Sequence, residues 1–387
     1  ENARQLTITA WIYPTTPLKG IQGLLTKSMV AEGLGYSLFI NQNGELALRV
    51  GDKLGSVAEV STGQPLERAE WCFVAGRIDL DAGRISVHQI CATWWRDKQQ
   101  IIHTLDPIKL GCTTNNVAPI LIAAFADGEG SSGNHMVHHF NGKIDGPKLF
   151  SRPLTDSEIS SMASGQVPDG IMAAWDFAMD ISSDRIVDVS GNEFHGHLIN
   201  LPTRAVTGHN WSGSEVDFRH ASSGYGAIHF HDDDLESANW DSDFVFEVPD
   251  NFKSGIYAVR LQTQGSQDYV PFFVRAKPGN ANAQILFLIP TLTYMAYGNE
   301  HFYDNLIPQL APHTNLELCP SEYGYIKENR LSSMYDLHPD GSGHWYFSRL
   351  RPILNMRPTY YNRSCASPFK FSADLHVTDW LEEMGHE

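Results

Sequence analysis

The chain has 387 residues, 42% of them hydrophobic and nine of them tryptophan, so it can bury two or three cores at one domain per ~150 residues. Its formal net charge of −17 argues against nucleic acid or an anionic membrane as a partner, because both repel an acidic surface. No run approaches the ~20 apolar residues of a membrane span, and no signal peptide opens the chain.

Residues 1–210 are predicted to be all-β, because short segments alternate apolar and polar residues between Asn-Gly or Ala-Gly turns. The strongest hairpin signal is Asn43-Gly44, between the apolar triplets 38–40 and 46–48. Many short strands with turn signals favour a β-sandwich or jelly roll, and residues 140–145 resemble a laminin-G-like or concanavalin-like domain. We expect a scaffold and interface rather than a lectin, since the loops lack a calcium or sugar-stacking constellation.

Residues 211–280 form a second β-rich region, with strand-like segments at 244–249, 254–263 and 269–276. Pro249 and Pro278 punctuate it. The pattern predicts a small immunoglobulin-like module that bridges its neighbours.

Residues 281–387 have a different hydrophobic pattern, and we predict that they begin an α/β domain. The continuous apolar run 285–289 is typical of a strand buried on both faces, as in parallel sheets. Residues 372–384 have the spacing of an amphipathic helix, which Gly385 ends. The predicted fold class is therefore multidomain β plus α/β, and the last domain would be glutamine-amidotransferase-like.

The five cysteines are an odd number, widely scattered, and contain no Cys-x-x-Cys motif. This usage favours free buried thiols over disulfides and predicts a reducing, cytoplasmic location. They are Cys72, Cys91, Cys112, Cys319 and Cys365.

Two polar segments near the C-terminal end are the strongest candidates for a functional site, because dense titratable groups on a glycine-rich loop are poor core material. The first places Tyr294, Tyr297, Asn299 and His301 after the apolar run. The second gathers Tyr335, Asp336, His338, Asp340 and His344 around Gly341 and Gly343. Arg349, Arg351 and Arg357 follow; they either clamp an anion or keep a strand edge soluble.

These motifs resemble the large (beta) subunit of N,N-dimethylformamidase and its relatives, an iron-dependent amide-hydrolase family. The likeness is carried by residues 293–297, 335–343 and 349–358, and it also covers 230–235 and 254–274. The family binds one ferric ion with two tyrosines and a glutamate from a later His-Pro-Glu segment, which this sequence lacks. The resemblance therefore implies part of a longer polypeptide, whose third ligand and general base lie outside this chain.

By motif position, Tyr294 and Tyr335 match the two tyrosine ligands of mononuclear Fe(III). The resemblance implies hydrolysis of N,N-dimethylformamide to dimethylamine and formate, with the ion polarising the amide and activating water. Asp336 and His338 are candidates for orienting Tyr335 or water. The expected partners are a small amide substrate, a small subunit of the same enzyme and further large subunits.

Two other functions remain open from the sequence. The β-rich first half would also suit a non-catalytic recognition protein, and an α/β start would suit a cysteine-dependent, amidotransferase-like hydrolase. The cluster of His229, His231 and Asp232–Asp234 is interpreted as a solvated turn after a strand rather than a metal site.

Overall fold

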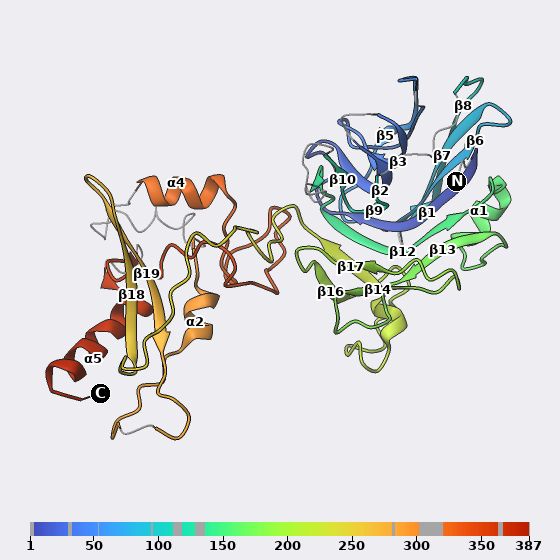
Figure 1. Ribbon diagram of the computed structural model, residues 1–387. Helices are drawn as coiled ribbons and strands as arrows, with labels where there is room; N and C mark the ends of the chain where they lie inside the picture. The colour runs from blue at the N-terminus through green and yellow to red at the C-terminus, as the bar shows by residue number, and fades with distance from the viewer. Residues whose placement is uncertain are drawn as a thin grey trace. The chain divides into compact units, whose positions relative to one another are not determined.

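The computed structural model describes residues 4–29, 33–52, 54–93, 96–110, 118–127, 136–280, 283–301, 320–362 and 367–386. Contacts divide the chain into two compact units, residues 1–234 (unit 1) and 235–387 (unit 2) (Figure 1). Regular structure is mostly β-sheet with few helices, which confirms the β-rich class predicted from the sequence. Within the described ranges, no helix combines the length and apolar character needed to cross a bilayer.

The large sheet of unit 1 has ten strands. They are β1 (Gln5–Pro14), β6 (Cys72–Asp79), β7 (Arg84–Thr93), β8 (Arg96–Leu105), β12 (Gly142–Phe150), β13 (Ile171–Asp176), β14 (Arg185–Asp188), β15 (Gly196–His197), β16 (Thr203–Val206) and β17 (Ala227–Phe230). The main path runs β15-β14-β13-β12-β1-β6-β7-β8, while β17 pairs with β12 and β16 with β17. Because these pairs are antiparallel, one face can be buried while the other meets solvent or a covering element.

The second sheet of unit 1 has five strands, in the order β5-β4-β3-β2-β9. They are β2 (Gln22–Ser28), β3 (Gly35–Ile40), β4 (Glu45–Gly51), β5 (Val57–Pro65) and β9 (Leu121–Ile122); the short strands β10 (Phe125–Ala126) and β11 (Met136–Val137) form a separate pair. The predicted Asn43-Gly44 hairpin joins β3 to β4, and Gly44 has the positive φ that such a turn requires.

The core of unit 1 lies between these two sheets. One cluster of buried apolar side chains combines residues of the large sheet, such as Ile8 and Val74, with residues of the smaller one, such as Leu38 and Leu48. The opposite face of the large sheet is covered by α1 (Asp156–Met162), whose Ile159 packs in a second cluster. A 3-10 helix, η1 (Ser222–Tyr225), precedes β17. The predicted β-sandwich is therefore confirmed.

The prediction of free thiols is wrong for one pair of cysteines. Cys72 on β6 and Cys91 on β7 lie directly opposite each other and form a disulfide, with 4.1 Å between their Cα atoms. The pairing depends on strand register, which the scattered spacing of the cysteines does not reveal. The other three cysteines lie outside the described residues.

Unit 2 contains a two-stranded hairpin and several short elements. They are β18 (Gly255–Gln262), β19 (Gln267–Val274), α2 (Thr291–Ala296), α4 (Pro320–Glu328), β20 (Tyr361–Asn362), β21 (Ser367–Pro368) and α5 (Phe371–Glu383). The last helix confirms the helix predicted for residues 372–384, although Val377, Trp380 and Met384 of its predicted apolar face are exposed. Gly385 follows it with positive φ and donates its N–H to Glu382, as a helix-ending glycine does.

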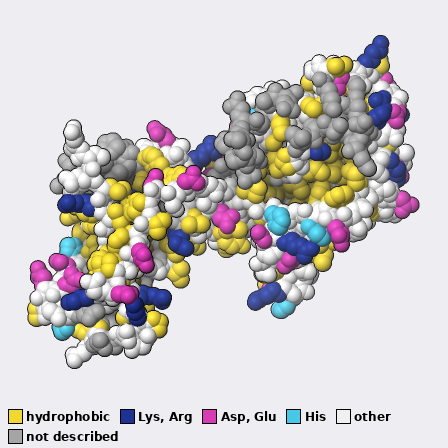
Figure 2. Space-filling model, in the orientation of Figure 1, with side chains coloured by type: hydrophobic (Ala, Val, Ile, Leu, Met, Phe, Trp, Pro, Cys, Tyr) yellow, Lys and Arg dark blue, Asp and Glu magenta, His cyan; other side chains and the backbone are white. Residues whose placement is uncertain are grey.

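Three predictions for this part of the chain are wrong. Residues 244–249, predicted as a strand, form none. The apolar run 285–289 is not a strand; Leu286 and Leu288 are 89% and 83% exposed, and apolar side chains are spread over the visible face of this unit (Figure 2). A buried strand of this type needs neighbours on both sides, and no described strand pairs with it. The predicted immunoglobulin-like module of residues 211–280 is not formed either. Residues 227–230 join the large sheet of unit 1 as β17, and β18 and β19 form a single two-stranded sheet, whereas such a module requires two packed sheets. The α/β architecture stays a prediction.

Candidate functional site

Tyr294 lies on α2, the short helix that begins after Pro290. Its side chain is buried, and its ring packs edge-on against Phe371 at the start of α5, with 5.7 Å between ring centroids. The Tyr294 hydroxyl donates a hydrogen bond to the carboxylate of Asp374, also on α5. Burial raises the pKa of Tyr294, and the hydrogen bond to this carboxylate and its charge raise it further, so the phenol is neutral here.

Tyr335 lies on an adjoining segment and is half exposed. Its ring stacks on that of Tyr297, with centroids 4.2 Å apart, and the hydrogen bond between these side chains raises the pKa of Tyr297. The backbone N–H of Met334 donates to the carbonyl of Ala296, 3.0 Å away, and so holds this segment against the end of α2. The two predicted tyrosine ligands therefore come from segments that touch each other. Their role as ligands stays a prediction.

Asp336 is buried, and its carboxylate organises the segment that carries Tyr335. It accepts hydrogen bonds from the backbone N–H and the hydroxyl of Ser333, both at 2.7 Å, and from the backbone N–H of His301 at 3.1 Å. The imidazole Nδ1 of His301 lies 3.3 Å from the same carboxylate. A carboxylate engaged in this way positions the backbone of its neighbours. The orienting role of Asp336 toward Tyr335 or water stays a prediction.

His338 is buried at the start of a compact glycine turn. Its backbone N–H donates to Ser342, and its carbonyl accepts from Gly341, both at 2.9 Å. Gly341 has positive φ, a conformation that glycine adopts at no steric cost. The imidazole of His338 packs against that of His344, with ring centroids 3.6 Å apart. The two predicted histidines of this loop thus lie together.

Asn299 was predicted as a polar residue of the site, and the structure gives it a structural role. Its side chain donates to the carbonyl of Pro352 at 2.7 Å and accepts from the N–H of Leu354 at 2.8 Å. The adjacent Glu300 is buried and accepts from the side chain of Asn362 at 2.7 Å. These contacts tie the segment after α2 to residues 352–362.

Two site residues were missed by the sequence analysis, Asp374 and Asn362. Asp374 was noted only as part of a helix start, and Asn362 carried no pattern at all. Their contacts join segments 80 and 62 residues apart, which no local spacing reports.

The three arginines of the second polar segment have different environments. Arg357 forms two side-chain hydrogen bonds to Asp268 on β19, and Arg349 is exposed. Arg351 lies with its guanidinium over the ring of Phe347, 5.2 Å from the ring centroid. Burial lowers the pKa of Arg351 to about 10, an effect that the charge of Asp336 opposes.

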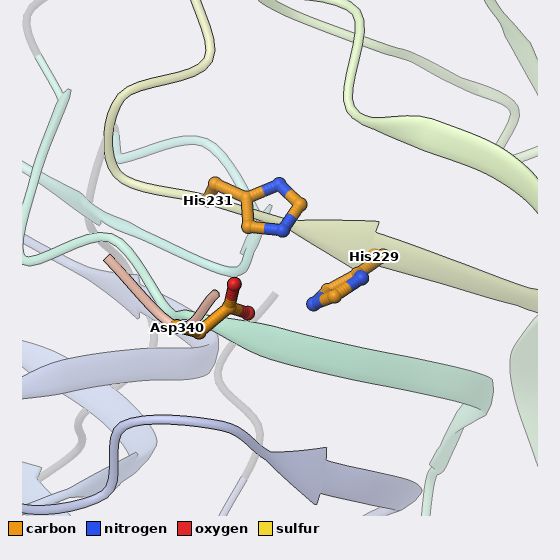
Figure 3. Close-up of side chains that lie close together, drawn as sticks. All are labelled: His229, His231 and Asp340. Carbon is orange, nitrogen blue, oxygen red and sulfur yellow. The ribbon is translucent and has the colours of Figure 1, made fainter. Parts of the chain in front are cut away.

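The histidine and aspartate cluster of unit 1 is a folded turn at the end of a strand. His229 is on β17 and His231 directly follows it, with ring centroids 4.1 Å apart (Figure 3). The backbone N–H of Asp232 donates to the side-chain oxygen of Asn141, whose amide donates back to the Asp232 carboxylate. Asp234 accepts from the backbone N–H of His231 at 3.0 Å. The turn after the strand is confirmed, but His229 and His231 are buried rather than solvated, and the choice against a metal site stays a prediction.

Comparisons with known proteins bear on the family. Residues 203–387 match the family described as N,N-dimethylformamidase beta subunit-like, C-terminal. The N,N-dimethylformamidase beta subunits of Paracoccus aminophilus and of an Alcaligenes species are 34% and 32% identical to this chain over 408 aligned positions. Each alignment covers 98% of this chain and 52% of the relative, so the chain spans about half the length of the curated relatives it matches.

A solved structure of the IT-sialidase CBM40 of Ruminococcus gnavus aligns with 41% of this chain, and the alignment covers 82% of that structure. The identity is 15% and the TM-score 0.33, a likeness too low to support a conclusion. The matched family region contains both predicted tyrosines, the glycine turn and the arginine segment. Residues 203–387 therefore match the N,N-dimethylformamidase beta subunit-like family, and the chain is similar to such beta subunits along 98% of its length.

Proposed function

We propose that this chain carries part of the active site of a hydrolase for small tertiary amides, with N,N-dimethylformamide as the substrate. The carbon–nitrogen bond of the amide would break, the oxygen of water would bond to the carbonyl carbon, and the amine would take a proton. The products are dimethylamine and formate. One observation carries the proposal: Tyr294 and Tyr335 stand on adjoining segments inside the region that matches the family.

The residues present fit a hard metal ion in the type of donor that they offer. Tyr294 and Tyr335 would hold a ferric ion as phenolates, and the Asp374 carboxylate adds a third oxygen beside Tyr294. When bound, ferric iron supplies a Lewis acid that polarises an amide carbonyl and lowers the pKa of a coordinated water.

Asp374 has a proton-handling role in this proposal. Tyr294 must lose its proton to become a phenolate, and its pKa is raised in the metal-free chain. The proton already lies in a hydrogen bond to the Asp374 carboxylate, so this group is placed to accept it. Asp336, held by Ser333 and His301, keeps the Tyr335 segment in place while the site forms.

The aromatic surroundings suit a substrate that has no N–H group and no charge. The rings of Tyr297 and Tyr335 stack on each other, and Phe369 lies edge-on to Tyr297 with 6.0 Å between centroids. A pocket for dimethylformamide needs apolar walls around one polarising group, and aromatic rings provide such walls.

The names of the two curated relatives support a proposal about assembly. We expect the intact protein to associate with a small subunit and with further copies of the large subunit. Co-expression followed by mass measurement of the native complex tests this, and a lone chain at native mass would reject it.

The test of function uses the intact polypeptide and measures dimethylamine release from N,N-dimethylformamide. Removal of iron with a chelator should abolish release, and added ferric iron should restore it. A thiol-alkylating agent serves as the control, because a cysteine nucleophile would be blocked by it. Activity that survives iron removal but not alkylation would reject the proposal in favour of a cysteine-dependent hydrolase.

A further inference from the structure

Arg351 presents two buried hydrogen-bond donors that no described residue accepts. Its Nε and Nη2 atoms are both shielded from solvent, and neither has a hydrogen-bond partner within the described part of the chain. The guanidinium packs over Phe347, and Asp336 contributes the only opposing charge that acts on it among the described residues. The carboxylate of Asp336 accepts its hydrogen bonds from Ser333 and His301.

The Nε and Nη2 atoms form one edge of the guanidinium. This edge can donate two parallel hydrogen bonds to the two oxygens of a carboxylate. Arg357 shows this use in the same unit, because its Nε and Nη2 donate to the two oxygens of Asp268 at 2.6 and 3.0 Å. Arg219 holds Asp217 in the same way, at 3.0 and 2.6 Å. Arg351 turns the same edge inward, without a protein carboxylate from the described residues.

Two guanidinium donors that are shielded from solvent and make no hydrogen bond are costly, because they have lost water without gaining an acceptor. Arg351 nevertheless stays protonated at neutral pH, since its pKa remains near 10. An anion with two coplanar oxygens would satisfy both donors and offset the charge in one step. A neutral amide would satisfy neither requirement fully.

We propose that the Nε–Nη2 edge of Arg351 binds the carboxylate of a small monocarboxylic acid. The inference rests on the proposed function in one respect, since amide hydrolysis releases such an acid and formate is the smallest. Arg351 belongs to the segment that Asn299 ties to the end of α2, so the acid would be held close to the tyrosine segments. Arg351 then discriminates the charged product from the neutral substrate.

Calorimetric titration of sodium formate into the intact protein tests this. Wild type should bind formate saturably, and Arg351→Gln should weaken binding about tenfold or more, the loss expected for a charge-assisted pair of hydrogen bonds. Arg349→Gln is the matched control, because Arg349 is exposed two residues away, and it should bind formate as wild type does. All proteins are compared at equal iron content, and circular dichroism reports whether each variant is folded.

Arg351→Lys decides the matter if the glutamine variant fails to fold, since lysine keeps the charge and the aliphatic stem but loses the fork. Its formate affinity should also fall; unchanged affinity in either folded variant overturns the proposal. So does a wild type that shows no saturable formate binding. Because calorimetry needs no turnover, amide hydrolysis without formate binding rejects the carboxylate site alone. Formate binding through Arg351 without amide hydrolysis rejects the proposed function and leaves the site in place.

Discussion

At the scale of single residues, Tyr294 and Tyr335 present the contrast on which the proposed metal site depends. One phenol is buried and bound to a carboxylate, whereas the other is half exposed and stacked on a second tyrosine. Sequence position alone made them equivalent candidates. Their environments differ because α5 packs against Tyr294, whereas Tyr335 stacks on the Tyr297 ring and is half exposed.

Changing either tyrosine to phenylalanine in the intact protein should lower iron occupancy and dimethylamine release together. The substitution keeps the ring and its packing and removes one anionic oxygen from the proposed ligand set. We expect at least a tenfold loss of activity, measured beside iron content and the visible tyrosinate-to-iron absorption.

Tyr346→Phe is the matched control for Tyr335→Phe, since the two tyrosines are about equally exposed, at 53% and 50%. The control should keep its iron and its colour. If Tyr294→Phe or Tyr335→Phe does the same and remains fully active, the ligand assignment is wrong.

At the scale of elements, β7 carries a histidine whose protonation opposes folding. His88 is fully buried near Arg77 of β6 and Asp156 of α1; burial and the charge of Arg77 lower its pKa to about 4, while the charge of Asp156 opposes them. Its Nε2 lies 3.0 Å from the Ser86 hydroxyl. The folded chain therefore holds this imidazole neutral.

The stability of unit 1 should fall as pH drops from 6.5 to 4. Above pH 6.5 His88 is neutral in both the folded and the unfolded chain, so the free energy of unfolding has its full value. Between pH 6.5 and pH 4 the unfolded chain binds a proton at His88 and the folded chain does not, which favours unfolding. The full loss is on the order of 3 kcal/mol, since each pKa unit is worth about 1.4 kcal/mol. Urea unfolding at several pH values measures it.

His88→Asn should flatten this pH dependence, because asparagine does not titrate. His197→Asn, at an exposed histidine on β15, should leave it unchanged. An identical slope in wild type and His88→Asn would show that other groups cause the loss.

The elements predicted correctly are those whose signals are local. The Asn43-Gly44 turn and the strands beside it, the β18–β19 hairpin and the helix ended by Gly385 each need only a few neighbouring residues to form. The strand predicted at 285–289 was wrong because a buried strand needs neighbouring strands that lie elsewhere in the sequence. The prediction of free thiols was wrong for the same reason, since the disulfide depends on the register of β6 against β7.

For the candidate site, too, the sequence predicted the local features but not the contacts between distant segments. The glycine turn at Gly341 and the tyrosines could be singled out from residue type, spacing and family likeness. The partners that determine their chemistry could not, because Asp374 reaches Tyr294 and Asp268 reaches Arg357 across 80 and 89 residues. The sequence identified Arg351 only as one arginine among three and did not reveal its shielded Nε and Nη2 donors.

At the scale of the whole molecule, the buried core is unevenly divided. The three hydrophobic clusters of the described residues belong to unit 1, and unit 2 buries few large apolar side chains, among them Tyr294, Leu331 and Phe371. Unit 1 also contains every partner strand of its two large sheets. We therefore expect unit 1 to be stable without residues 235–387.

A fragment of residues 1–234 should fold by itself and unfold cooperatively on heating. Its transition temperature should lie within a few degrees of the one that the longer chain shows for the same sheets, followed by circular dichroism. A fragment without a cooperative transition would contradict the division into units. The fragment would also serve to test the expectation that this sandwich is a scaffold, because a glycan panel titrated against it should give no saturable binding.

The bond between Cys72 and Cys91 joins strands that hydrogen-bonding already pairs along their whole length. Reduced and oxidised molecules should therefore have the same outline, the same sheets and the same site, and differ only by two hydrogen atoms. Which form a cell contains then depends on the compartment rather than on the fold. Alkylation of free thiols at the moment of cell lysis, followed by mass measurement, would show which form was present.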